Sequence, residues 1–332
     1  MVSEIVLPSP ALPTPALART QVGYAIPAIV AGAGERASRR FLEFFAATIR
    51  NPNTRAAYYR AIVRFFAWCE AHGLDELALI EPLHVAAYVE QLGHDFEKPT
   101  VKQHLAAVRM LFDWLVTGGV LAVNPAAPVR GPKHVVKRGR TPVLTADEAR
   151  QLLDSIDVST VIGLRDRALI ALMTYTFARI SASVAMRVED YYPEGKRWWV
   201  RLHEKGGKEH AMPAHHNLEA WMDVYIHAAG LTDQRKTPLF RTTRARTGTL
   251  TTEGMTRVDA WRMIRRRARE AGLDVAVCCH TFRATGITAY LDNGGTLENA
   301  QMMAAHESPR TTKLYDRTGD EITLDEVERI AI

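Results

Sequence analysis

The first third of the chain carries apolar residues at spacings of three and four, which is the pattern of amphipathic helices. Helical segments are predicted from about 35 to 49, 53 to 72, 82 to 92 and 99 to 117. Their apolar stripes include Phe41, Phe44, Phe45 and Ile49, then Tyr58, Ile62, Phe65, Phe66 and Cys69, and finally Leu105, Val108, Leu111, Phe112 and Leu115. Asn53 or Thr54 can cap the second segment. Residues 35–129 are therefore predicted to form a small helical bundle.

Regular patterning stops on both sides of this bundle. Four prolines fall within the first twenty residues, so 1–34 is expected to be a flexible N-terminal tail. Between 124 and 142, prolines and glycines break periodicity again, which predicts a linker over 130–142. The linker concentrates positive charge in Arg130, Lys133, Lys137, Arg138 and Arg140. A solvated tether needs no such charge, so contact with phosphate groups is expected, although a solvated linker is the alternative.

A second pattern begins at residue 143 and extends to 332. Thr145 and Glu148 have the spacing of a capping box, and helices are predicted near 146–155 and 161–177. Strands are predicted at 197–202 and 210–213, with the turn at Gly206-Gly207, and helices resume from 218. The predicted fold is mainly α with a small β-hairpin, in two domains.

Composition narrows the class of protein. The 332 residues include 47% hydrophobic ones and carry a net charge of +5, which favours a polyanionic partner. The three cysteines include an adjacent pair, so a reducing, cytoplasmic setting is expected rather than a disulfide framework. No run approaches the ~20 apolar residues of a membrane span. His210, His215 and His216 fit no zinc pattern, so no metal and no cofactor are expected.

Six side chains in the second domain fit one chemistry. Tyr315 lies late in the chain, and a phenol with a pKa near 10 needs a base or nearby cations before it can attack. His280 and Arg283 lie three residues apart, on one helix face. Arginine forks match the oxygens of a phosphate, and histidine can transfer protons near neutral pH. The full set is Arg179, Lys205, His280, Arg283, His306 and Tyr315, with Lys208 as a rival for Lys205.

With these residues in this order, the region from about 143 to 320 resembles the tyrosine recombinase (phage integrase) family, including Xer-type recombinases. The first domain more weakly resembles the helical, SAM-like core-binding domain of that family. The resemblance implies that Tyr315 forms a 3′-phosphotyrosine with DNA and that Arg179 and Arg283 hold the scissile phosphate. It also implies that His280 acts as base or stabilises charge, that His306 orients the phosphate, and that Lys205 protonates the leaving 5′-oxygen.

Three positions depart from the family pattern. Phe177 and Ala305 occupy positions where the family commonly has glycine, and Ala182 occupies the position of an acid. The resemblance implies a site-specific recombinase of a mobile element, located in the cytoplasm with the nucleoid. Its partners would be double-stranded DNA and a homo-tetramer, or a hetero-tetramer with related recombinases. The alternatives are a catalytically impaired accessory protein and a type IB-like topoisomerase.

Two further segments have open interpretations. A cluster of arginines between 262 and 269 includes Arg262, Arg265 and Arg266, which either face solvent or follow the phosphates of DNA. The segment after Tyr315 is first acidic and then apolar. It either packs on its own domain or, as in the family, forms a C-terminal docking segment for a neighbouring protomer.

Overall fold

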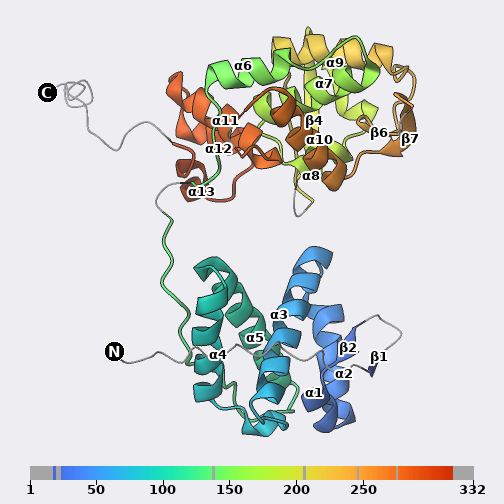
Figure 1. The fold of residues 1–332 in the computed structure, drawn as a ribbon. Helices are drawn as coiled ribbons and strands as arrows, with labels where there is room; N and C mark the ends of the chain where they lie inside the picture. The colour runs from blue at the N-terminus through green and yellow to red at the C-terminus, as the bar shows by residue number, and fades with distance from the viewer. Residues whose placement is uncertain are drawn as a thin grey trace, which may run out of the picture. The chain divides into compact units, whose positions relative to one another are not determined.

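The computed structural model describes residues 18–19, 24–136, 139–204, 207–244, 247–273 and 276–316. The chain divides after residue 135 into two compact units, each with its own hydrophobic core. Both units are built mainly of helices (Figure 1). Within the described residues, no helix is both long and apolar enough to cross a membrane.

The first unit is a helical bundle, as its apolar periodicity predicts. Its main helices are α2 (Glu35–Glu43), continued by a π-helical turn (Phe44–Thr48), α3 (Pro52–Ala71), α4 (Pro82–Asp95) and α5 (Lys98–Thr117). A 3-10 turn, Leu77–Leu79, joins α3 to α4. Asn51, rather than Asn53 or Thr54, caps α3: its side chain accepts hydrogen bonds from the backbone of those two residues.

The expectation of a flexible tail through residue 34 is wrong for residues 24–34. Strand β2 (Ala25–Ile26) pairs with β1 (Ala18–Arg19), and the short helix α1 spans Ala28–Gly32. Ile29 and Val30 are 1% and 0% exposed, because this short apolar segment completes the core of the bundle. This segment is too short to give a periodic signal in the sequence.

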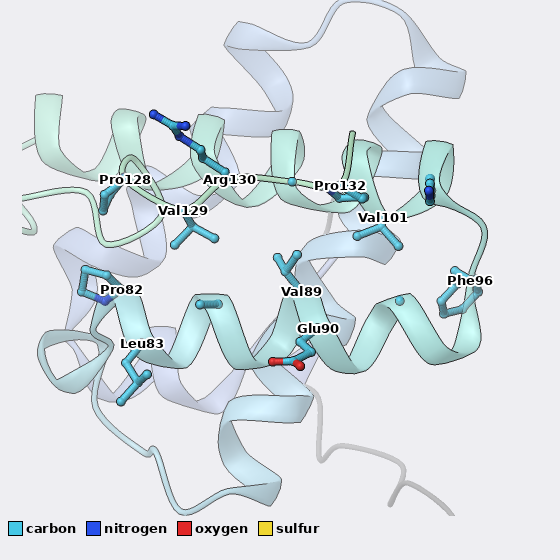
Figure 2. Close-up of a pocket in the computed structure, with 14 residues that line it drawn as sticks. Pro82, Leu83, Val89, Glu90, Phe96, Val101, Pro128, Val129, Arg130 and Pro132 are labelled. Atoms are coloured by element: carbon cyan, nitrogen blue, oxygen red, sulfur yellow. The ribbon is translucent and has the colours of Figure 1, made fainter. Parts of the chain in front are cut away.

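A groove of about 810 Å³ lies in the first unit between α4 and the segment 128–132. Its lining is mainly apolar, and Figure 2 shows Val89 of α4 facing Val129 across it. The segment is fixed by Arg109 of α5, whose guanidinium donates to the backbone carbonyls of Ala126 and Val129. Arg109 therefore ties this segment to the bundle.

The second unit combines helices with small antiparallel sheets. Its helices are α6 (Ala146–Asp154), α7 (Val161–Tyr175), α8 (Ile180–Ala185), α9 (His216–Ala228), α10 (Arg257–Glu270), α11 (Cys279–Asp292), α12 (Leu297–Met303) and α13 (Pro309–Lys313), with a 3-10 turn at Val188–Asp190. One sheet contains β3 (Tyr191–Glu194), β4 (Arg197–His203) and β5 (Glu209–Pro213). A second contains β6 (Arg241–Thr243) and β7 (Leu250–Gly254). The predicted hairpin is the β4–β5 pair, and the predicted capping box starts α6.

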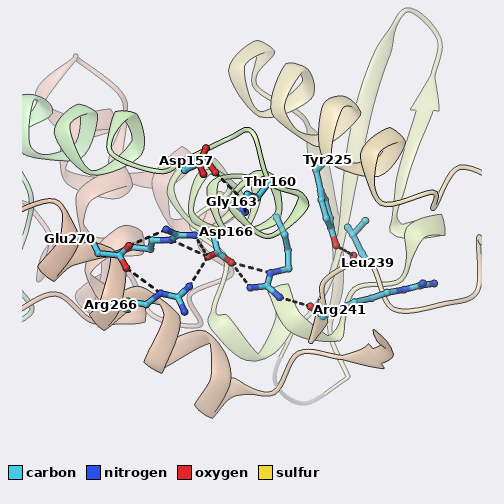
Figure 3. Close-up of polar contacts among 11 residues, drawn as sticks. Asp157, Thr160, Gly163, Asp166, Tyr225, Leu239, Arg241, Arg266 and Glu270 are labelled. Carbon is cyan, nitrogen blue, oxygen red and sulfur yellow. Dashed lines mark hydrogen bonds and ion pairs between the residues drawn. The ribbon is translucent and has the colours of Figure 1, made fainter. Parts of the chain in front are cut away.

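A buried carboxylate joins three elements of this unit. Asp166 of α7 is 0% exposed and accepts hydrogen bonds from Arg165, Arg266 and Arg267. Arg165 in turn donates to the backbone carbonyl of Arg241 at 2.8 Å, which ties α7 to β6 (Figure 3). Since Arg266 and Arg267 belong to α10, this network fixes α10 against α7.

Candidate active site

Tyr315 and His280 are in direct contact in the candidate site. Tyr315 follows α13, and His280 is the second residue of α11. Oη of Tyr315 lies 2.5 Å from Nε2 of His280, which is hydrogen-bonding distance. The hydroxyl of Thr288 on α11 donates to the backbone carbonyl of Tyr315 at 2.9 Å. The tyrosine is thus fixed at both its ring and its backbone.

The environment sets the protonation of this pair. Burial raises the pKa of Tyr315, while the positive charges of Arg283 and Arg179 act in the opposite direction. The pKa of His280 is lowered from 6.5 by burial and by the charges of Arg283 and Arg179. Tyr315 is therefore a protonated donor and His280 a neutral acceptor at neutral pH. His280 is exposed to solvent, whereas Tyr315 is buried.

His306 also packs against the tyrosine. Its ring is nearly parallel to that of Tyr315, with centroids 5.8 Å apart and planes inclined by 8°. Nδ1 of His306 lies 2.8 Å from the hydroxyl of Thr312. Burial, followed by the charges of Arg283, Arg179 and His280, lowers the pKa of His306 to about 3. His306 is therefore a neutral hydrogen-bonding group near the phenol.

Arg283 is the buried cation of the site. It is 1% exposed, and its guanidinium donates to the backbone carbonyl of Phe177 and, at 2.6 Å, to that of Ala304. Burial is the main cause that lowers its pKa, to about 10, so Arg283 stays charged at neutral pH. The Nε of Arg283 has no hydrogen-bond partner among the described residues.

Two non-glycine residues near Arg283 have left-handed backbone conformations. Phe177 has a φ of 55° and Ala305 a φ of 46°, and such conformations favour glycine. The phenyl group of Phe177 is 3% exposed and packs edge-on against Tyr290, with ring centroids 6.1 Å apart. Gly286 of α11 lies beside it, where a Cβ would be 2.0 Å from the carbonyl oxygen of Thr174 and 2.9 Å from the ring. Burial of the ring offsets the strain at this turn.

Arg179 enters the site from the N-cap position of α8. Its side chain is 32% exposed, and its Nη1 forms a short ion pair with Oε2 of Glu204, a side chain that is 3% exposed. Ala182, the position where the family has an acid, is buried without polar atoms in its side chain. A carboxylate is therefore supplied to Arg179 from the end of β4.

Of the two candidate lysines in the β4–β5 turn, the structure describes only Lys208. Lys205 lies outside the described residues. Lys208 is exposed, and its ammonium lies 3.2 Å from the carboxylate of Glu307, the residue after His306. The structure thus brings together Arg179, His280, Arg283, His306 and Tyr315, and it ties Lys208 to a surface acid.

The residues expected to contact DNA fall in separate regions. Arg130, Lys133 and Arg140 are exposed, while Lys137 and Arg138 lie outside the described residues. On α10, Arg262 and Arg265 are exposed, and Arg265 lies over the ring of exposed Trp261 at 5.8 Å. Arg266 is also exposed but pairs with Asp166 and Glu270. Part of the charge of Arg266 is therefore neutralised by ion pairs within the second unit.

Sequence reasoning missed three residues that support the site. Thr312 contacts His306, Thr288 holds the Tyr315 carbonyl, and Glu204 pairs with Arg179. Thr312 lies three residues before Tyr315, but a threonine at that spacing is not distinctive. Glu204 stands directly before Lys205, and no periodic pattern relates it to an arginine 25 residues earlier.

Comparisons with known proteins place both units of the chain in one family. Residues 142–321 match the phage integrase family, and residues 39–118 match the family described as "Phage integrase, N-terminal SAM-like domain". The chain is 29% identical over 291 residues to tyrosine recombinase XerD of Corynebacterium glutamicum, covering 84% of this chain and 90% of that protein.

Solved structures share the fold. A lambda integrase (75-356) dimer bound to a COC′ core site superposes with a TM-score of 0.64 at 19% identity, covering 86% of this chain and 97% of that one. The XerH site-specific recombinase, in a post-cleavage complex with a palindromic difH substrate, gives a TM-score of 0.66 at 17% identity. That match covers 84% of each chain.

Proposed function

Because the chain belongs to the phage integrase family, as a Xer-like tyrosine site-specific recombinase, we propose that it breaks and rejoins DNA through Tyr315. The phenol oxygen of Tyr315 attacks the scissile phosphorus, a bond forms between Oη and phosphorus, and the bond from phosphorus to the 5′-oxygen breaks. The products are a 3′-phosphotyrosine and a free 5′-hydroxyl. Reversal by an incoming 5′-hydroxyl rejoins the strand, so no ATP is consumed.

The observation that carries this proposal is the 2.5 Å contact between Tyr315 and His280. A buried phenol with a raised pKa does not ionise at neutral pH, so its proton must move during attack. The neutral imidazole of His280 already lies in position to receive that proton. The pair thus supplies both the nucleophile and its base.

The other side chains would stabilise the charge that develops on the phosphoryl oxygens. Arg179 and Arg283 provide guanidinium groups, and removing one donor of this kind typically slows a reaction by a factor of ~10²–10³. If the Thr312 hydroxyl donates to Nδ1 of His306, then Nε2 of His306 carries a proton and can donate to the phosphate. Lys205 would protonate the departing 5′-oxygen.

The proposed partner is double-stranded DNA. Related structures include a lambda integrase tetramer bound to a Holliday junction, and four protomers on two sites would suit this chain as well. These protomers would be copies of this chain or include related recombinases. We assign the role of docking onto a neighbouring protomer to the segment after Asp316, which lies outside the described residues. We also propose that the recombinase belongs to a mobile element.

The test uses a nicked suicide DNA that carries the native site, taken from the sequence flanking the gene. In denaturing electrophoresis, the wild type should form a covalent adduct without divalent metal, and Tyr315→Phe should form none while binding DNA with unchanged affinity. DNA binding without any wild-type adduct, with and without added related recombinases, would favour the accessory protein. Relaxation of supercoiled DNA that lacks the site would favour the topoisomerase.

The geometry weakens the case for an impaired accessory protein. That alternative rests on Phe177 and Ala182. Phe177 adopts the left-handed conformation that a glycine would provide, and its carbonyl accepts a hydrogen bond from Arg283. Arg179 has a carboxylate partner although residue 182 is alanine. Neither departure leaves its arginine unsupported.

A further inference from the structure

Glu204 is a buried acid at the base of the β4–β5 hairpin. Its side chain is 3% exposed, and its Oε2 accepts a short hydrogen bond from Nη1 of Arg179. The backbone N–H of Glu204 donates to the carbonyl of Lys208 at 2.7 Å, which closes the hairpin at that point. The strand pairing therefore fixes the backbone that carries this carboxylate.

Arg179 has few other constraints. Its backbone starts α8, its side chain is 32% exposed, and Glu204 is its one side-chain hydrogen-bond partner among the described residues. A long side chain that is free to rotate would lose conformational entropy when it binds a phosphate. An arginine already held in place loses less of this entropy.

A single contact leaves the rest of the guanidinium available. Arginine has five N–H donors, and Oε2 of Glu204 is bonded to Nη1 alone, so Nη2 and Nε remain for a phosphate. The carboxylate also offsets part of the positive charge that Arg179 and Arg283 place in the site. Helix α8 packs against β4, so Glu204 approaches the arginine from the strand beside the helix that carries Ala182.

We propose that Glu204 is a positioning residue, which holds Arg179 ready for the scissile phosphate. It would take the role of the family's acid at position 182, which is alanine in this chain. This inference rests on the proposed function. It also links the arginine to the hairpin whose turn contains Lys205, the next residue in the sequence. Movement of that hairpin would therefore move the partner of Arg179.

The first test compares Glu204→Gln and Glu204→Asp with the wild type in single-turnover cleavage of the suicide DNA. Glu204→Gln should lower the cleavage rate at saturating DNA by about 10- to 100-fold, the range typical for loss of a group that orients a metal ligand. DNA affinity should change less than twofold, and Glu204→Asp should recover part of the rate. Glu209→Gln, on the same hairpin but 57% exposed, is the matched control and should cleave normally.

A double variant distinguishes positioning from a general structural role. In an Arg179→Ala background, Glu204→Gln should cause no further loss of rate, because its effect passes through the arginine. A structural role would instead lower the melting temperature and reduce the rate in both backgrounds. Equal losses with and without Arg179 would overturn the inference.

The outcomes separate this inference from the proposed function. An adduct that persists in Tyr315→Phe would overturn the proposed nucleophile. An adduct that depends on Tyr315 but forms at the wild-type rate in Glu204→Gln would overturn the positioning role alone.

Discussion

Arg283 donates a hydrogen bond to the backbone carbonyl of Phe177, a non-glycine residue held at a φ of 55°. The same guanidinium donates to Ala304, which precedes the second non-glycine residue with positive φ, Ala305. Left-handed conformations of this kind typically cost about 1–3 kcal/mol for residues other than glycine. The buried arginine is thus anchored to two turns that the surrounding packing must hold.

Replacing Ala305 by glycine should relieve one of these turns. Because its φ of 46° suits glycine, we expect Ala305→Gly to raise the free energy of unfolding by up to about 1 kcal/mol. Ala304→Gly is the matched control, because Ala304 has a φ of −79°, which suits alanine. This variant should lower the free energy of unfolding by about 1 kcal/mol. Urea denaturation measures both, and equal destabilisation by the two glycines would contradict the role of backbone strain.

Asp166 should be among the least tolerant positions of the second unit. Asp166→Ala would leave Arg165, which is 3% exposed, without its ionic partner. Breaking a buried pair typically lowers the free energy of unfolding by about 3–5 kcal/mol. The control is Asp147→Ala, which removes an exposed ion pair with Arg150 and should cost about 1 kcal/mol or less. Denaturant unfolding of both variants checks this, and similar costs would show that the network is not needed.

The periodic elements could be predicted because their signals are local. The stripes of α3 and α5 repeat at three and four residues, and Thr145 and Glu148 form the predicted capping box. The hairpin followed from two short strand-like runs around Gly206-Gly207. The five described catalytic candidates could be selected because their order in the chain resembles that of a family.

Contacts between distant segments could not be predicted in this way. The ion pair of Arg179 with Glu204 and the convergence of arginines on Asp166 depend on how α7, α8, α10 and β4 pack. Nothing in the apolar pattern of α7 marks Asp166 as a buried acceptor. The packing of Ile29 and Val30 could not be predicted either, because a five-residue helix is too short for a periodic signal.

The pH dependence of cleavage should report the state of His280. Its pKa lies below 6.5, so the rate at low DNA concentration should rise as pH increases through that lowered pKa and level off by about pH 7. Above the pKa the ring is neutral and can accept the phenol proton. His280→Asn should be slower and lose the acidic limb. An acidic limb of the wild-type profile that persists unchanged in His280→Asn would exclude His280 as the base.

The arginines of α10 should differ in their contribution to DNA binding. Arg262 and Arg265 are exposed, whereas Arg266 is paired with Asp166 and Glu270. Each phosphate contact contributes about −0.9 to the slope of log affinity against log salt. Arg262→Ala and Arg265→Ala should each reduce the slope by about one, and Arg266→Ala by less. A larger change for Arg266→Ala, in a protein with unchanged stability, would contradict this ranking.

A sulfur atom at the leaving position can distinguish the two candidate lysines of the hairpin. A thiol has a pKa near 8.5 and leaves without a proton, unlike an alcohol, so DNA with a 5′-bridging sulfur needs no general acid. Lys205→Ala should slow cleavage of ordinary DNA by about 10²–10⁴ and cleave the sulfur-containing DNA at nearly the wild-type rate. Lys208 is already paired with Glu307, so Lys208→Ala should change both rates by less than about tenfold. If sulfur rescues Lys208→Ala instead, that lysine is the acid, and its ion pair with Glu307 must open before cleavage.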